Sequence, residues 1–364
     1  MKIRSVETFI VEIPFHHGAT QQTVTPMTWH TLENVLVRIE DDQGHIGWGE
    51  AFGYFVANAS KAVIDRLIAP QLLEQDINDI AAWNLDMQQR LHLFGRYGVT
   101  MFALSGVDIA LWDLAAQRAG VPLYQLLGTQ STRSQLPAYA SMVRYADNHV
   151  APAICEKALK AGFRDIKLHE TTVAEVAACR RAIGDNVPLA TDVNCSWTPA
   201  QTYERLPELQ ALKLAWLEEP IFPPEDFATL ASLRARGVPL SAGENWCTRI
   251  QFEQALEQGA VDSIQPSVTK VGGISECLRI GEVAREHHAV VLPHCPYFGP
   301  GFLATLHLAA VQPWVPQIEY LFVEPAGWLY DIEDLRSDHL LHVPQSKGLG
   351  LAMDMNVFEH FSRR

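Results

Sequence analysis

The chain has 364 residues, 48% of them hydrophobic, and its formal net charge at pH 7 is −14. This acidic balance argues against nucleic acid as a partner, and no apolar run is long enough to predict a membrane span. The N-terminus lacks the apolar core of a signal peptide, and the 6 cysteines show no C-x-x-C spacing. We therefore expect a cytoplasmic protein with reduced thiols that does not bind membranes, and we also expect a homo-oligomer.

Residues 1–125 predict a small α+β domain. Residues 2–13 are rich in β-branched side chains, and residues 35–50 contain two such runs around a turn, so both stretches predict strands. Residues 59–93 and 100–119 predict helices, and the second is apolar nearly all round, which indicates a buried position. Strands followed by helices are typical of an α+β unit.

A polar stretch at residues 16–30 separates the predicted strands and is too long for a tight turn. Such a segment is either a mobile surface connection or a functional lid, and the sequence alone leaves both open. Its hydroxyl, amide and imidazole groups suit sugar hydroxyls. We interpret Thr23 and Trp29 as candidate substrate contacts on this loop.

Alternating strands and helices follow from about residue 134, and the helical segments end in glycines placed as left-handed C-caps. The predicted strands end at intervals of roughly 25 residues, at Ser141, Lys167, Asp192, Glu218, Glu244, Ser267, His294 and Glu319. Units of this size predict a TIM barrel over residues 126–320, in which the last unit lacks a proper closing helix. The irregular residues 321–364 are interpreted as returning to the first domain.

Acidic residues end successive strands of the predicted barrel, at Asp192, Glu218 and Glu244. The C-terminal strand ends of a TIM barrel share one mouth, where active sites lie. A lone acid there is often only a helix cap, but a set of carboxylates without thiolate or imidazole suits Mg²⁺. We therefore predict one Mg²⁺ per subunit at these residues; Mn²⁺ would also fit.

Basic residues flank the predicted metal site. Lys167 and His169 stand two positions apart, so they share one face of a strand. His294 follows an apolar strand roughly across the barrel, where a lone histidine is more often structural, but here it shares the mouth with a metal. Bases on two sides of Mg²⁺ suit removal of the proton α to a carboxylate, with nearby positive charge stabilising the enediolate.

These stretches, in this order, resemble the enolase superfamily and, within it, the mandelate racemase subgroup. The resemblance rests on Ala110–Leu114, Gly120–Gly128, Lys167-x-His169, Asp192-x-Asn194, Glu218-Glu-Pro220, Gly243–Trp246, Lys270–Gly273, His294 and Glu319. It implies a (β/α)₇β modified TIM barrel with an N-terminal α+β capping domain, and metal ligands at Asp192, Glu218 and Glu244. It also implies that the loop around residues 16–30 closes over the substrate.

Two positions depart from the pattern of the subgroup. Members often carry Lys-x-Lys where this chain has Lys167-x-His169, so His169 replaces the usual lysine base or Lys167 takes that role. Members also pair the seventh-strand histidine with an aspartate on the sixth strand, whereas this chain has Ser267 in that place. These departures leave the acid and base assignments open.

The resemblance implies a Mg²⁺-dependent dehydratase that converts a sugar acid, an aldonate or aldarate, to a 2-keto-3-deoxy acid. His294 would be the acid and His169 or Lys167 the base. The other candidate contacts with this small carboxylate substrate are Asn194, Ser267 and Glu319. The alternatives are a racemase or epimerase of a 2-hydroxy acid, a cycloisomerase of an anhydro or lactone sugar acid, and a non-catalytic, metal-stabilised barrel that serves as a binding or scaffold protein.

Overall fold

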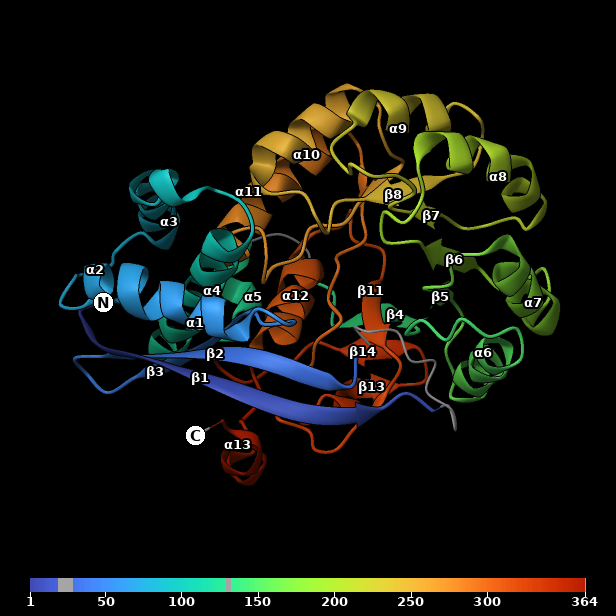
Figure 1. Ribbon diagram of the computed structural model, residues 1–364. Coiled ribbons are helices and arrows are strands. Elements are labelled where there is room, and N and C mark those ends of the chain that lie inside the picture. Colours follow the sequence, from blue (N-terminus) through green and yellow to red (C-terminus); the bar gives the residue numbers. More distant parts are fainter. Residues whose placement is uncertain (19–28, 129–131, 364) are drawn as a thin grey trace.

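The computed structural model describes residues 1–18, 29–128 and 132–363. Figure 1 shows a barrel with a smaller sheet-and-helix unit, the cap, lying against it. The cap sheet has the strand order β12-β1-β2-β3, in which β12 comprises Glu324–Pro325. Its long strands are antiparallel and comprise β1 (Ile3–His16), β2 (Thr31–Asp41) and β3 (Ile46–Phe52). The predicted hairpin is therefore confirmed, and its register pairs Asn34 with Phe52.

Helices follow the cap strands as the sequence predicts. They are α1 (Ala57–Val63), a π-helical turn (Ile64–Ile68), α2 (Ala69–Leu72), α3 (Ile80–Arg90), a 3₁₀ turn (His92–Phe94), α4 (Val99–Ala119) and α5 (Tyr124–Leu127). Helices α1 and α4 pack on the sheet, α3 packs on α4, and α5, which the sequence did not predict, packs on α12 (Pro300–Val311). Asp79 caps the N-terminus of α3 by accepting a hydrogen bond from Ala82 N. Helix α4 ends at Gly120, which adopts the left-handed conformation that favours glycine.

Helix α4 is long and apolar enough to cross a membrane, yet 78% of its apolar window is buried. It lies directly against β3, and glycines permit the close approach. A Cβ atom on Gly47 would lie 2.2 Å from the Ala110 carbonyl oxygen, and one on Gly49 would lie 2.0 Å from that of Gly106. Helix α4 is thus a core helix of the cap, as its apolar circumference predicts.

The barrel strands are parallel, and the part of the chain that the structure describes contains eight of them. They are β4 (Gln135–Ser141), β5 (Ile166–Leu168), β6 (Leu189–Asp192), β7 (Leu217–Glu218), β8 (Leu240–Ala242), β9 (Ser263–Ile264), β10 (Val290–Val291) and β11 (Ile318–Leu321). The connecting helices are α6 (Val150–Lys160), α7 (Val173–Ile183), α8 (Pro199–Ala211), α9 (Phe227–Arg234), α10 (Thr248–Glu257), α11 (Gly273–Glu286) and α12 (Pro300–Val311). This is the predicted (β/α)₇β barrel.

Some strand ends differ from the sequence prediction. β8, β9 and β10 end at Ala242, Ile264 and Val291, two or three residues before the predicted ends at Glu244, Ser267 and His294. Prolines explain two of the three differences: Pro266 and Pro293 have no N–H to continue a ladder. The polar residues at these positions therefore stand on the loops just beyond the strands.

The C-terminal residues contact both the barrel and the cap. Strand β12 (Glu324–Pro325) pairs with β1. The hairpin of β13 (Arg336–Ser337) and β14 (Leu340–His342) adds to β4. Helix α13 (Met355–Phe361) packs against the cap sheet, where the rings of Phe358 and Phe9 lie 5.2 Å apart. A 3₁₀ turn (Glu333–Leu335) precedes the hairpin.

Candidate active site

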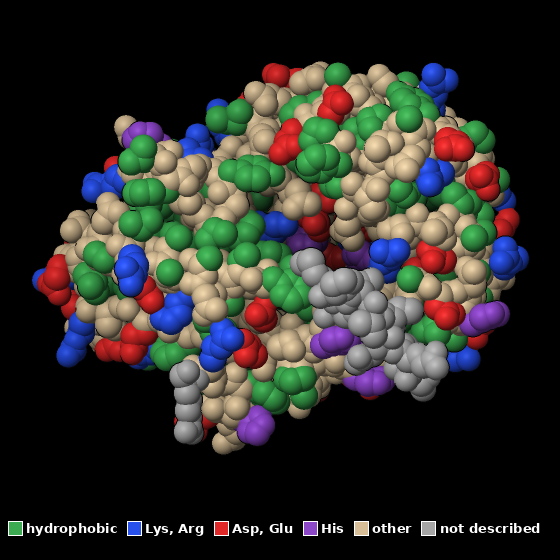
Figure 2. Space-filling view, in the orientation of Figure 1, with side chains coloured by type: hydrophobic (Ala, Val, Ile, Leu, Met, Phe, Trp, Pro, Cys, Tyr) green, Lys and Arg blue, Asp and Glu red, His purple; other side chains and the backbone are tan. Residues whose placement is uncertain are grey.

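A cavity of about 460 Å³ opens where the cap meets the C-terminal ends of the barrel strands. Figure 2 shows a hollow in this region with acidic, basic and histidine side chains inside it. The predicted site residues that line the cavity are Trp29, His169, Asn194, Glu244, His294 and Glu319. Lys167, Asp192 and Glu218 are buried just beneath them. Thr23 lies outside the described residues.

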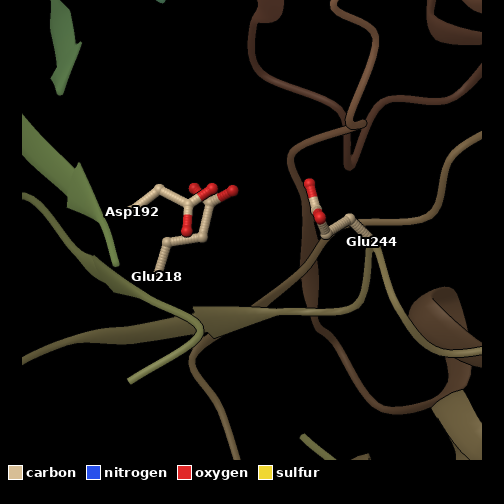
Figure 3. Close-up of side chains that lie close together, drawn as sticks. All are labelled: Asp192, Glu218 and Glu244. Carbon is tan, nitrogen blue, oxygen red and sulfur yellow. The ribbon is translucent and has the colours of Figure 1, made fainter. Parts of the chain in front are cut away.

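The acidic residues at the ends of three successive strands come together at the mouth of the barrel. Asp192 and Glu218 are register partners in β6 and β7, and Glu244 stands two residues beyond β8. Carboxylate oxygens of these three residues lie within 4.8 Å of one another. Figure 3 shows Asp192 and Glu218 side by side, with Glu244 facing them across a gap. Oxygen donors in this arrangement are the ligands that Mg²⁺ prefers.

The acid cluster carries more negative charge than the neighbouring side chains neutralise. Burial and the nearby Asp192 raise the pKa of Glu218 to about 8, although Lys167 opposes the shift. Burial, Glu244 and Asp192 hold the pKa of Glu219 well above its ordinary value. A divalent cation would stabilise the ionised form of both carboxyls, so the residues present fit a metal ion.

Lys167 lies beneath the cavity in contact with carboxylates. Its Nζ is 2.7 Å from Glu218 Oε1, 3.0 Å from Glu319 Oε1 and 3.6 Å from Asp192 Oδ2. Burial by itself would lower the pKa of Lys167, but these carboxylates raise it well above the ordinary value. Because a charged ammonium group cannot accept a proton, these contacts favour a role for Lys167 as a source of positive charge over a role as a base.

His169 lies one layer above Lys167 and lines the cavity. Its Nδ1 makes a hydrogen bond to the carbonyl oxygen of Met142. A carbonyl oxygen only accepts, so Nδ1 carries a proton, and the neutral ring has its lone pair on Nε2. This Nε2 is 3.5 Å from Asp192 Oδ2. Burial lowers the pKa of His169, but the neighbouring Asp192 outweighs it and the pKa is raised overall.

His294 lines another side of the cavity, and its Nε2 is 2.8 Å from Glu244 Oε2. Its Nδ1 is buried and has no hydrogen-bond partner within the described ranges. Sequence reasoning gave Ser267 the place beside this histidine, and the structure corrects that interpretation. The Ser267 hydroxyl is 2.8 Å from that of Tyr297, which donates to the His294 carbonyl oxygen. Ser267 is fully buried and does not line the cavity.

The other predicted substrate contacts, Asn194, Glu319 and Trp29, differ in how many of their polar groups are left to bind a substrate. Asn194 donates its backbone N–H and its side-chain amide to Asp192, at 2.7 and 3.0 Å, so it orients that carboxylate. Glu319 accepts from Ser141 Oγ and from Cys295 N, at 2.7 and 2.8 Å. Trp29 uses its Nε1–H on a backbone carbonyl and therefore presents an apolar ring to the cavity.

Four charged residues that sequence reasoning did not assign to the site also line the cavity: Glu33, Glu50, Arg144 and Lys270. Lys270 Nζ is 3.2 Å from Asn245 Oδ1, and Glu50 accepts a hydrogen bond of 2.9 Å from Gly301 N. The acids were predicted from their positions at strand ends. The same criterion would have identified Arg144, which stands three residues beyond the end of β4. Glu50 lies inside β3, where no sequence signal separates it from a surface carboxylate.

Residues 5–128 match the family model of the mandelate racemase / muconate lactonizing enzyme N-terminal domain, and residues 151–357 match that of the enolase C-terminal domain-like family. The chain belongs to the enolase superfamily. An arabinonate dehydratase from Saccharolobus solfataricus is 30% identical over 347 residues, 91% of each chain. A D-galactarolactone cycloisomerase from Agrobacterium fabrum is 32% identical over 384 aligned positions, 99% of each chain. The crystal structure of the 3,6-anhydro-D-galactonate cycloisomerase from Zobellia galactanivorans superposes with a TM-score of 0.86 at 26% identity, covering 100% of both chains.

Enolase-superfamily sites use a lysine or histidine base together with Mg²⁺ that stabilises an enediolate. The corresponding groups of this chain lie in or directly beneath one cavity. They are the carboxylates of Asp192, Glu218 and Glu244, the buried ammonium group of Lys167, and the imidazoles of His169 and His294. These parts can polarise a carboxylate, remove a neighbouring proton and protonate a leaving group.

Proposed function

We propose that this enzyme removes the proton α to the carboxylate of a sugar acid and eliminates the β-hydroxyl, which gives a 2-keto-3-deoxy acid. One observation carries the proposal: the hydrogen bond from His169 Nδ1 to a carbonyl oxygen leaves a basic Nε2 facing the cavity beside the acid cluster. The arabinonate dehydratase similarity supports the reaction class. A cavity lined by acids, histidines and an arginine suits a polyhydroxylated substrate better than an apolar one.

Asp192, Glu218 and Glu244 would hold the Mg²⁺ ion. When bound, Mg²⁺ supplies positive charge that stabilises the negative charge developing on the substrate carboxylate as the enediolate forms. Asn194 keeps Asp192 oriented through two hydrogen bonds. Lys167 adds a fixed positive charge from below, because its ammonium group is locked between carboxylates.

The proton transfers are assigned to the two histidines. His169 Nε2 takes the α-proton, and the electron pair of the C–H bond moves into the enediolate. His294 then delivers a proton to the β-hydroxyl, the C–O bond breaks, and water leaves. The resulting enol takes up a proton to become the 2-keto acid. His294 lines the cavity, and the contact of its Nε2 with Glu244 Oε2 at 2.8 Å orients the ring for this step.

A cycloisomerase is the second candidate, because the Agrobacterium fabrum relative aligns over 99% of both chains. Its first step would be the same removal of an α-proton. The leaving group would be a ring oxygen that stays attached to the molecule, so the mass of the substrate would not change. Product mass therefore separates the candidates: a dehydratase product is lighter by one water.

A library of aldonates, aldarates and their lactones, incubated with Mg²⁺-loaded enzyme in D₂O, tests the proposal. We expect at least one sugar acid to yield a 2-keto-3-deoxy product by NMR and mass spectrometry. His169→Gln should abolish both turnover and α-deuteration, whereas His287→Gln, an exposed histidine at the end of α11, should behave as wild type. If no sugar acid reacts or exchanges its α-hydrogen, the proposed function is wrong.

A further inference from the structure

Arg144 is a positively charged residue that lines the cavity, and most of its N–H donors are not used in hydrogen bonds with the other described residues. It is exposed, it follows β4, and its Nη2 donates to Thr171 Oγ1 at 2.8 Å. No carboxylate lies within 4.0 Å of its guanidinium in the described part of the chain. Lys270, by comparison, is 3.9 Å from Glu244 Oε1 and stacks over the Phe52 ring at 4.9 Å. A guanidinium has five N–H donors, so Arg144 keeps donors for a ligand.

The backbone on both sides of Arg144 is fixed. Glu170 accepts hydrogen bonds from Tyr145 N and Ala146 N, at 2.8 and 2.9 Å. The Tyr145 hydroxyl donates to the His17 carbonyl oxygen at 2.7 Å, which ties this loop to the cap. On the other side of Arg144, Met142 N donates to the Lys167 carbonyl oxygen of β5 at 2.9 Å. The guanidinium therefore projects from an anchored loop, so the backbone does not have to be ordered when Arg144 binds a ligand.

The order of the strands places Arg144 away from the metal end of the cavity. Around the mouth, β4 carries Arg144, β5 carries His169, and β6 carries Asp192, the first acid of the metal cluster. Adjacent strands are about 4.8 Å apart, so β4 and β6 are separated by roughly 10 Å. A six-carbon diacid with one carboxylate at each end spans about this distance.

We propose that Arg144 binds a second carboxylate at the far end of the substrate, so that the enzyme prefers aldarates to aldonates. This inference rests on the proposed function and deepens it by naming the substrate class. An arginine binds a carboxylate with two parallel N–H···O bonds, which a lysine cannot reproduce. The terminal hydroxymethyl group of an aldonate brings no negative charge to this position and cannot accept both bonds.

Matched acid pairs test the inference, because galactarate and galactonate, or glucarate and gluconate, differ only at the terminal carbon. We expect wild type to favour the diacid at least tenfold in kcat/KM. Arg144→Gln should lower kcat/KM for the diacid by about 10- to 100-fold, mainly through KM, since hydrogen bonds to charged groups have about this effect. The monoacid should change less than about threefold, and Arg144→Lys should lie between the two.

Arg164→Gln is the matched control, because Arg164 is exposed and precedes β5, at the end of the barrel opposite the mouth. Equal losses for diacid and monoacid in Arg144→Gln would overturn the inference, as would unchanged kinetics or a wild type without diacid preference. If wild type turns over no sugar acid, the proposed function fails. Calorimetric titration of Mg²⁺-loaded protein with galactarate and galactonate then decides on Arg144 alone: a diacid preference lost in Arg144→Gln supports the inference, and equal affinities overturn it.

Discussion

The two sides of the cavity that carry histidines differ in how their polar groups are partnered. On the β5 side, Lys167 contacts three carboxylates and both ring nitrogens of His169 have a polar neighbour. On the β10 side, His294 Nδ1 is buried without a partner among the described residues, and the buried Glu50 receives one backbone N–H, from Gly301. On the β5 side both ring nitrogens of the histidine are therefore partnered, whereas on the β10 side Glu244 partners the Nε2 of His294 and, among the described residues, nothing partners its Nδ1.

This difference indicates that the two histidines have different tasks. The hydrogen bond to the Met142 carbonyl selects one neutral tautomer of His169, whose lone pair is on Nε2, and this suits the proposed role as base. His294 has no Nδ1 partner to stabilise an imidazolium after it takes up a proton, whereas its Nε2 is held by Glu244. A racemase needs a competent base on each side of the α-carbon. The asymmetry therefore favours elimination, in which one side takes a proton and the other gives one.

The largest expected effect comes from the acid cluster that both sides share. EDTA should remove activity, Mg²⁺ should restore it, and Glu218→Gln should lower kcat by at least about 10³-fold through weakened metal binding. The fold should remain, because Glu218 ends a strand of the barrel core without forming that core. Glu204→Gln, on the exposed surface of α8, is the control. Full turnover by metal-free protein would contradict the metal assignment.

Variants of His169 and His294 test whether the two sides of the cavity have different catalytic roles. His169→Gln should abolish both dehydration and exchange of the α-hydrogen with D₂O, with losses of about 10²- to 10⁴-fold. His294→Asn should slow dehydration by a similar factor and still permit α-exchange, because the base on β5 is intact. NMR in D₂O measures both processes in one sample. Loss of exchange in His294→Asn together with retained exchange in His169→Gln would reverse the assignment.

A smaller effect is expected from giving the β10 side a charge partner. Ser267 lies beside Tyr297, whose hydroxyl donates to the His294 carbonyl oxygen, so Ser267→Asp adds a carboxylate one side chain away from His294. The aspartate should make His294 a better base, because it stabilises the imidazolium. We expect roughly tenfold faster α-deuteration of epimers that the wild type handles slowly, and slower dehydration. Unchanged exchange with an intact fold would show that the missing partner does not limit His294.

The acid cluster and the basic residues of the β5 side could be predicted from the sequence. The spacing of Asp192, Glu218 and Glu244 placed three acids at one end of a predicted barrel, and the structure brings them together. The alternation in Lys167-x-His169 put both side chains on one face. Sequence reasoning left open which of the two is the base. The proposed choice of His169 depends on burial and on the Met142 carbonyl oxygen, which lies 27 residues away along the chain.

The β10 side was harder to predict for a related reason. Strands β9 and β10 end before the prolines that precede Ser267 and His294, so these residues follow loop geometry rather than strand register. The contact of Ser267 with Tyr297 therefore had no periodic signal. Glu50 comes from the cap and meets Gly301 of the barrel 251 residues later in the chain, a contact that only the assembled fold creates.

The smallest expected effect tests whether Glu50 is as poorly partnered as its contacts indicate. Burial raises the pKa of Glu50 to about 7, against an ordinary value of 4.5, although the Gly301 N–H opposes the shift. A carboxyl whose pKa is raised by folding stabilises the protein fully below about pH 4.5, and this contribution is lost as the pH rises through about 7.

Glu50→Gln keeps an acceptor for Gly301 and cannot ionise. Its free energy of unfolding should therefore match wild type near pH 5 and exceed it by up to about 3 kcal/mol near pH 8.5. Denaturant unfolding at the two pH values measures the difference, with Glu204→Gln as the exposed control. A difference that does not grow with pH would mean that Glu50 has a charge partner, and the two sides of the cavity would then be more alike than their hydrogen bonds indicate.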